Sequence, residues 1–270
     1  MAKAFVETTV LTDALLKPEA GRAARAALRK YDVTELPAYA IKEFKAGPLK
    51  NVVWFHNKLV TTSSFARAIG ALQKMSLSPK RYTTATALEA LREAARKTGS
   101  MTTSEMVRDY GPVASQDAVL TDRFRLAIKT TVSRAWRRRK SLVSAVVYPL
   151  PCYQEVDLTE ESGQLILGNL RCNGPAECEM AQRLKKDQGS LVAMKAAVDA
   201  LPQNAENHRR SQALRHLIRT PKREFPDKMC RALGDAVFAF LAPSDSTILT
   251  TNVRDIEPLA KALGKPVERP

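Results

Sequence analysis

The first fifty residues alternate short apolar runs with amphipathic stretches. The segment KAFVETTVL begins with a β-prone run that reaches Glu7, and the Ala, Arg and Leu spacing that follows predicts a helix. A second strand is predicted over 33–36, and Pro37 then opens a helix that we expect to end at Gly47-Pro48. The order strand, helix, strand, helix predicts a parallel α/β sheet.

The chain changes character from about residue 49 to residue 204, where most patterns are helical. A strongly helix-prone stretch, TATALEALREAARK, is followed by a long amphipathic segment at 121–139. The short apolar run at 144–148 fits a strand that Pro149 closes. This part of the chain is therefore expected to be an insertion or a second lobe.

The carboxyl-terminal part returns to alternating elements. A helix is predicted over 208–219, another opens at Pro226, and a strand at 246–250 precedes a short helix at 257–263. We therefore predict an α/β protein with a two-part core at 1–50 and 205–263, a mainly helical insertion at 51–204, and a frayed tail at 264–270.

The composition is typical of a soluble globular protein, with 44% hydrophobic and 26% charged residues. No apolar run approaches the roughly 18–20 residues that a membrane span needs. Glu7 and Asp13 interrupt the apolar stretch at the amino terminus, which therefore fits folded structure better than a signal peptide. We expect a cytoplasmic protein without a membrane partner.

The net charge is strongly positive, because 43 Lys and Arg face 28 Asp and Glu, giving +15. Such a charge favours polyanions, and nucleic acid is the commonest soluble one; the alternative is a simple solubility device. Basic residues cluster at 122–140, and a second basic run starts at His208. Guanidinium groups and an indole can contact phosphates and an unpaired base, whereas the alternative is a solvated basic helix face whose Trp packs inward. The predicted nucleic-acid-binding residues are Arg134, Trp136, Arg137, Arg138, Arg139, Lys140, Arg209 and Arg210.

The four cysteines lie at 152, 172, 178 and 230 without a C-x-x-C pair. His208 could complete a zinc set on paper, but the spacing is wider than zinc sites ordinarily use. Reduced thiols are the favoured interpretation.

Four carboxylates occupy similar positions next to predicted strands. Glu7 ends the first strand, Glu43 lies on the helix after the second, and Asp255 follows the last strand within TTNVRDIEPL. Asp235 lies on an otherwise apolar helix, where an unpaired carboxylate would cost several kcal/mol and needs a cation. The polar residues of TTNVRDIEPL would also suit an ordinary surface turn; a metal site would give all four carboxylates one role, because strand ends of a parallel sheet form the usual ligand crevice.

Four short motifs resemble those of the PIN-domain nucleases, a family that includes VapC-type toxins. FVETTVLTDALL is similar to the opening motif, LPAYAIKEF to the second acidic motif, LGDAVFAF to the third and ILTTNVRDIEPL to the fourth. The resemblance covers roughly 1–50 and 205–263, and each motif is weak by itself but specific in this order. It implies a PIN-like three-layer α/β/α fold with a short central parallel sheet, enlarged here by the helical insertion.

By that resemblance, Glu7, Glu43, Asp235 and Asp255 would hold Mg²⁺ or Mn²⁺, supported by Thr8 and Asn252. Hard divalent cations take oxygen ligands, and they can activate water for phosphodiester hydrolysis. The implied function is a metal-dependent endoribonuclease, of a toxin or defence type, with RNA as substrate and DNA as an open alternative. A protein antitoxin or inhibitor and a homo-oligomer are implied as partners.

Two departures from the family pattern keep a second function open. The first motif ordinarily opens with Asp, whereas Glu7 is one methylene longer, and the long separation of Glu43 from Asp235 is unlike a small PIN toxin. The alternative is a non-catalytic RNA-binding or assembly protein with a degenerate PIN site.

Overall fold

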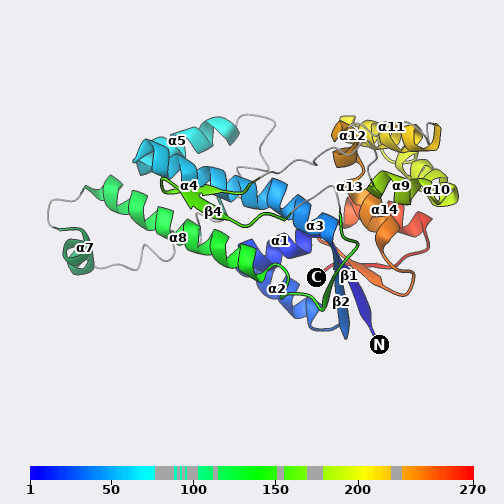
Figure 1. Ribbon diagram of the computed structural model, residues 1–270, viewed down its shortest axis with the longest axis horizontal. Helices are drawn as coiled ribbons and strands as arrows, with labels where there is room; N and C mark the ends of the chain where they lie inside the picture. The colour runs from blue at the N-terminus through cyan, green and yellow to red at the C-terminus, as the bar shows by residue number, and fades with distance from the viewer. Residues whose placement is uncertain are drawn as a thin grey trace.

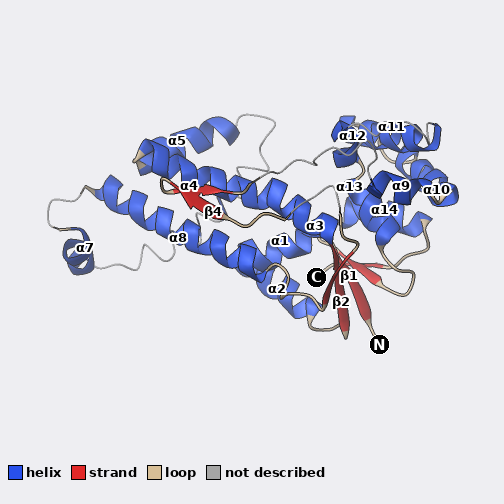
Figure 2. Cartoon of the chain, in the orientation of Figure 1, coloured by secondary structure: helices blue, strands red, loops and turns tan. Residues whose placement is uncertain are grey.

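The structure is a computed structural model that describes residues 1–76, 88–89, 92, 95, 103–111, 115–150, 155–168, 179–219 and 227–270. Its centre is a five-stranded sheet in the order β3-β2-β1-β6-β7, and all four strand pairs are parallel. Helices lie on both sides of these strands (Figure 2). The predicted α/β class with a short central parallel sheet is therefore confirmed. The sheet strands are β1 (Lys3–Val6), β2 (Val33–Pro37), β3 (Ala145–Val147), β6 (Thr247–Leu249) and β7 (Val267–Glu268).

The amino-terminal elements follow the predicted order, with one correction. The helix after β2 does not end at Gly47-Pro48, because a π-helical turn, η1 (Lys45–Leu49), carries the chain past Pro48 into a further helix. Proline lacks the amide donor that an α-helix interior needs, and a widened turn accommodates that loss without breaking the helix. The helices of this half are α1 (Thr8–Leu16), α2 (Pro18–Leu28), α3 (Ala38–Phe44), α4 (Lys50–Thr62), α5 (Phe65–Ser76), α7 (Thr103–Tyr110) and α8 (Gln116–Arg138).

The predicted insertion at 51–204 does not form one separate body. In Figure 1, α4, α5 and α8 extend away from the sheet, with the hairpin of β4 (Thr159–Glu161) and β5 (Gln164–Ile166) packed against α4. The chain then returns, since β3 joins the sheet beside β2, and two later helices pack against the carboxyl-terminal part. The helices of this second half are α9 (Glu179–Lys185), α10 (Gln188–Asp199), α11 (Ala205–Arg219), α12 (Asp227–Ala232), α13 (Gly234–Leu241) and α14 (Val253–Ala262).

The predicted frayed tail at 264–270 also needs correction. Val267 pairs with Ile248, and Lys265 donates hydrogen bonds to two carbonyl oxygens at the end of α13. The tail therefore closes one edge of the sheet.

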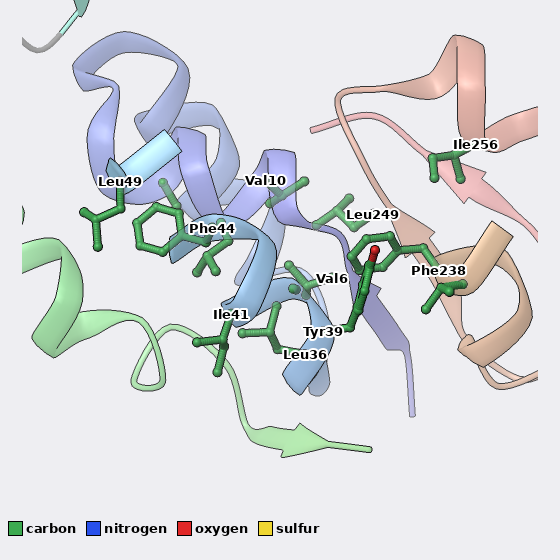
Figure 3. Packing of buried hydrophobic residues seen from close by; sticks show 14 of the residues in the cluster. Val6, Val10, Leu36, Tyr39, Ile41, Phe44, Leu49, Phe238, Leu249 and Ile256 are labelled. Atoms are coloured by element: carbon green, nitrogen blue, oxygen red, sulfur yellow. The ribbon is translucent and has the colours of Figure 1, made fainter. Parts of the chain in front are cut away.

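Apolar side chains from both halves of the sequence form one core around the central strands. Phe5, Leu36, Phe44 and Leu249 are fully buried, and Phe238 packs its ring against Tyr39 with centroids 5.6 Å apart. Figure 3 shows Leu36, Tyr39, Phe44, Phe238 and Leu249 converging from β2, α3, α13 and β6. Burial of each such side chain stabilises the fold by roughly 1.5–3 kcal/mol, so the core fixes where each strand ends.

The packing of α1 against α2 depends on a glycine. A Cβ on Gly21 would lie 2.6 Å from the backbone oxygen of Asp13, whereas a Cβ on Gly70 of α5 would meet no atom within 4 Å.

We expect Gly21→Ala to lower the free energy of unfolding by about 1–3 kcal/mol, because the two helices must separate. Gly70→Ala should raise it by about 0.5–1 kcal/mol through helix propensity. Urea unfolding followed by circular dichroism measures both, and equal stabilisation by the two variants would contradict the close approach.

Candidate active site

The sheet order places a topological switch point between β1 and β6. From β1 the chain proceeds outward through β2 and β3 on one side, and later through β6 and β7 on the other. Ligand sites of open parallel sheets lie at the carboxyl ends of the strands beside such a point. The register pairs Val6 with Leu249, so the residues that follow these two strands, Glu7 and Thr250, are neighbours.

Glu7 is held at the start of α1 by hydroxyl and amide donors. Its carboxylate accepts hydrogen bonds from the Thr9 amide at 3.0 Å, from the Thr9 hydroxyl, and from the Thr250 hydroxyl at 2.9 Å. The side chain is only 4% exposed, and burial raises the pKa of Glu7 to about 7, with the Asp235 charge adding to the rise while the hydrogen bonds oppose it. Glu7 is therefore a buried carboxylate whose hydrogen-bond partners are amide and hydroxyl groups.

Glu43 reaches the same region from the last turn of α3. Thr8 donates its hydroxyl hydrogen bond to Glu43 Oε2 at 2.8 Å. Burial, together with the neighbouring charge of Glu7, raises the pKa of Glu43 to about 8. A Cβ on Gly234 would lie 2.7 Å from Glu43 Oε1, so a larger residue there would displace this carboxylate.

Asp235 and Asp255 share one cation, the guanidinium of Arg210 on α11. Arg210 Nη2 lies 2.5 Å from Asp235 Oδ2, and Arg210 Nη1 lies 3.4 Å from Asp255 Oδ1. Asn252 also donates to Asp235 Oδ1, at 3.4 Å. Burial raises the pKa of Asp235 to about 6; Arg210 opposes this shift and Asp255 adds to it.

The four predicted carboxylates thus divide into two linked pairs. Glu7 and Glu43 interact with each other, Asp235 interacts electrostatically with both, and Arg210 joins Asp235 to Asp255. No Lys or Arg forms an ion pair with Glu7 or Glu43 in the part of the chain that the structure describes. Like charges buried together without a cation are costly, which is the condition that a bound cation relieves.

In donor chemistry this pocket fits a hard divalent cation, because carboxylates, hydroxyls and an amide oxygen are the ligands such ions take. The distances between the side chains do not match a formed metal site, because among the described residues no three Asp, Glu, His or Cys side chains are close enough together to hold a metal. Glu7, Glu43 and Asp235 would therefore have to move closer together to hold an ion jointly, while Arg210 already supplies positive charge at Asp255.

Two of the residues predicted to bind RNA from the basic segment at 122–140 are buried. The Trp136 ring is 4% exposed, and the Arg139 guanidinium lies 3.6 Å from its centroid while pairing with Glu155. The indole therefore has no face for a nucleic-acid base, and its position on the apolar stripe of α8, four residues after Val132 and eight after Ile128, accounts for its inward direction. The residues predicted to bind RNA that remain exposed on this segment are Arg134, Arg137, Arg138 and Lys140.

The second basic run, which starts at His208, also contains one exposed and one buried arginine among the residues predicted to bind RNA. Arg209 is exposed, but Arg210 is 6% exposed and belongs to the carboxylate pocket instead of an RNA-binding surface. The sequence carried a signal for this, since Asn207, Arg210, Ala213, Leu214 and Leu217 form one buried stripe of α11. Thr9 and Thr250, the hydroxyl donors to Glu7, were not predicted, although both stand inside the quoted motifs.

The structure describes Cys230, which is partly exposed, whereas the cysteines at 152, 172 and 178 lie outside the described residues. A zinc site that combines them with His208 is therefore a question on which the structure is silent.

The raised carboxylate pKa values give stability a definite pH dependence. Folded Glu7, Glu43 and Asp235 keep their protons to about pH 7, 8 and 6, whereas unfolded carboxyls lose them near pH 4. Between these limits the native state binds more protons, so the free energy of unfolding falls as pH rises. In EDTA we expect the Tm to fall by several degrees from pH 5.5 to 8.5, and Glu43→Gln to flatten that fall. Calorimetry across this range checks it, and identical slopes for both proteins would be the contrary result.

Comparison with known proteins identifies no relative. No protein-family model, curated protein or solved structure matches this chain. Within the described residues no helix is long and apolar enough to cross a membrane.

Proposed function

We propose that this chain is a PIN-like Mg²⁺- or Mn²⁺-dependent endoribonuclease. The observation that carries the proposal is the grouping of buried Glu7 with part-buried Glu43 and Asp235 at the switch point between β1 and β6, with no ion-paired Lys or Arg at the first two in the described residues. A parallel sheet places its reactive groups at this edge, and a buried acidic set of this kind suits phosphodiester chemistry that uses no Ser, Cys or His nucleophile.

The protein's own residues would bind and orient the parts of the reaction. Thr9 and Thr250 fix the Glu7 carboxylate, Thr8 fixes Glu43, and Asn252 fixes Asp235. This support matters because a ligand displaced by an ångström loses much of its effect. Bound Mg²⁺ or Mn²⁺ would supply Lewis acidity toward water and toward phosphate oxygens.

RNA is the proposed substrate, with DNA as the alternative that phosphate contacts alone do not distinguish. The exposed Arg134, Arg137, Arg138, Lys140 and Arg209 supply positive charge for phosphate contacts. A cytoplasmic toxin or defence role, an inhibitor protein and a homo-oligomer belong to the same proposal and follow from the family resemblance.

One observation favours a second candidate, a non-catalytic RNA-binding protein with a degenerate site. Arg210 neutralises Asp235 and Asp255 from within the chain, and it is held in turn by Glu206 at 2.9 Å and Asn207 at 3.2 Å. A fixed guanidinium at two of the four carboxylates would compete with a metal ion for them.

Cleavage of a labelled RNA in Mn²⁺ or in EDTA separates the two candidates. We expect cleavage by the unchanged protein only with Mn²⁺, and a loss of about a hundredfold or more in Glu43→Gln and Asp235→Asn, because each removes a buried ligand charge. Glu161→Gln is the matched control, since Glu161 is exposed on β4 away from the pocket.

Equal or absent cleavage in every sample would defeat the nuclease proposal. Retained, salt-sensitive RNA binding in those same samples would then support the non-catalytic candidate. Asp255→Asn adds a graded test, because Asp255 is the carboxylate already paired with Arg210 and Arg254.

The competition at Arg210 can be measured without any substrate. We expect Arg210→Gln to bind Mn²⁺ at least about tenfold more tightly than the unchanged protein in titration calorimetry, because removal of the guanidinium leaves Asp235 and Asp255 without their cation. Arg209→Gln, one position earlier and exposed, should leave Mn²⁺ affinity unchanged. Weaker Mn²⁺ binding by a folded Arg210→Gln protein would show that the guanidinium supports the pocket.

A further inference from the structure

A groove of about 820 Å³ lies between α2 and the carboxyl-terminal half of α8, apart from the carboxylate pocket. Its lining includes the apolar residues Leu15, Leu16, Ala135 and Leu142. Figure 1 shows α8 ending beside α1 and α2, where these walls meet. The groove is therefore built by elements that are far apart in the sequence but fixed against one another by the core.

Each wall carries arginines at helical spacing. Arg22 and Arg25 lie three positions apart on α2, and Arg134 and Arg138 lie four positions apart on α8, so each pair shares one face of its helix. The rise of a helix separates Arg134 from Arg138 by about 6 Å along the axis. Two rows of guanidinium groups thus line a single opening.

Among the described residues, no acidic side chain forms an ion pair with the arginines of these two rows. Among the other charged lining residues, Lys17 pairs with Asp13 at 2.8 Å and Arg92 pairs with Glu19 at 3.3 Å. Within the described residues, Arg22, Arg25, Arg134 and Arg138 form no ion pair, although Arg25 donates a hydrogen bond to the carbonyl of Ala14. Glu89 is the remaining acidic residue of the lining. A cleft lined mainly by one sign of charge concentrates the opposite sign.

We propose that this groove binds the phosphate backbone of a single-stranded RNA segment. Arginine forks bind phosphate oxygens in a bidentate manner, as they bind carboxylates, and two rows of arginines along one groove suit a ligand with repeated anionic groups such as a nucleic-acid backbone. The apolar lining residues can receive the face of an unstacked base, which a duplex would keep inside its stack. RNA as the polyanion rests on the proposed function.

The groove is joined to the carboxylate pocket by α1. Glu7 caps the amino end of this nine-residue helix, and Leu15 and Leu16 at its other end line the groove. The helix is about 13 Å long, so the groove would hold substrate a few nucleotides from the residues proposed to act on it. The groove would then be an anchoring site that contributes affinity and no chemistry.

The test is equilibrium binding of a fluorescent oligouridine of about 12 nucleotides, measured by anisotropy in EDTA so that no cleavage occurs. Arg22→Gln/Arg134→Gln should weaken binding by about tenfold at low salt and reduce the salt slope by about 1.4, from about 0.7 for each lost phosphate contact. Arg29→Gln/Arg67→Gln is matched in charge change, uses exposed residues outside the groove, and should weaken binding less than about twofold.

Equal losses in the two double variants, or no loss in either, would overturn the groove, as would displacement of the RNA by polyglutamate at equal charge concentration. Melting curves confirm that each variant is folded. The outcome is independent of catalysis: loss of binding in Arg22→Gln/Arg134→Gln, together with absent cleavage by the unchanged protein in Mn²⁺, would keep the groove and reject the nuclease.

Discussion

The repulsion among buried carboxylates at the β1–β6 switch point is the constraint around which the rest of the structure is arranged. Burial raises the pKa of Glu7 to about 7 and that of Glu43 to about 8, with the Asp235 charge contributing to the first shift and the Glu7 charge to the second. Three threonine side chains, those of Thr8, Thr9 and Thr250, donate hydrogen bonds to these two carboxylates. Hydrogen bonds reduce the cost of such burial without removing it. Among the described residues, Arg210 supplies positive charge at Asp235 and Asp255, whereas Glu7 and Glu43 have hydrogen-bond donors and no ion pair.

The ion pairs of Arg210 with Asp235 and Asp255 explain why the two carboxylate pairs differ in how their charge is compensated. Arg210 faces Asp235 and Asp255, where its guanidinium is 6% exposed and is itself anchored by α11 neighbours. A buried ion pair of this kind is costly to break from one side, since the remaining charge is left alone in a medium of low polarity. Any cation entering the pocket would therefore meet less resistance at Glu7 and Glu43 than at Asp255.

Local patterns were sufficient to predict which residues stand at the strand ends, and they were insufficient to predict what faces them. Glu7 and Asp255 follow short apolar runs, and such runs become strands whose ends meet at one edge of a parallel sheet. The partner of Asp235 could not be predicted in this way, because Arg210 reaches it only through the packing of α11 beside α13. The Trp136 side chain was misassigned for a different reason, since its charged neighbours obscured the apolar stripe to which it belongs.

The two sets of arginines show how the same side chain serves opposite purposes in one chain. Arg139 is buried against Trp136 and Glu155, and Arg210 is buried against carboxylates. Their charges are therefore compensated within the fold. Arg22 and Arg134 face an open groove, where their charges are available to a ligand in solution. Net charge therefore says little about where a polyanion binds. Ion pairing within the fold neutralises some arginines, and the groove is a place where arginines without an ion pair among the described residues line open space.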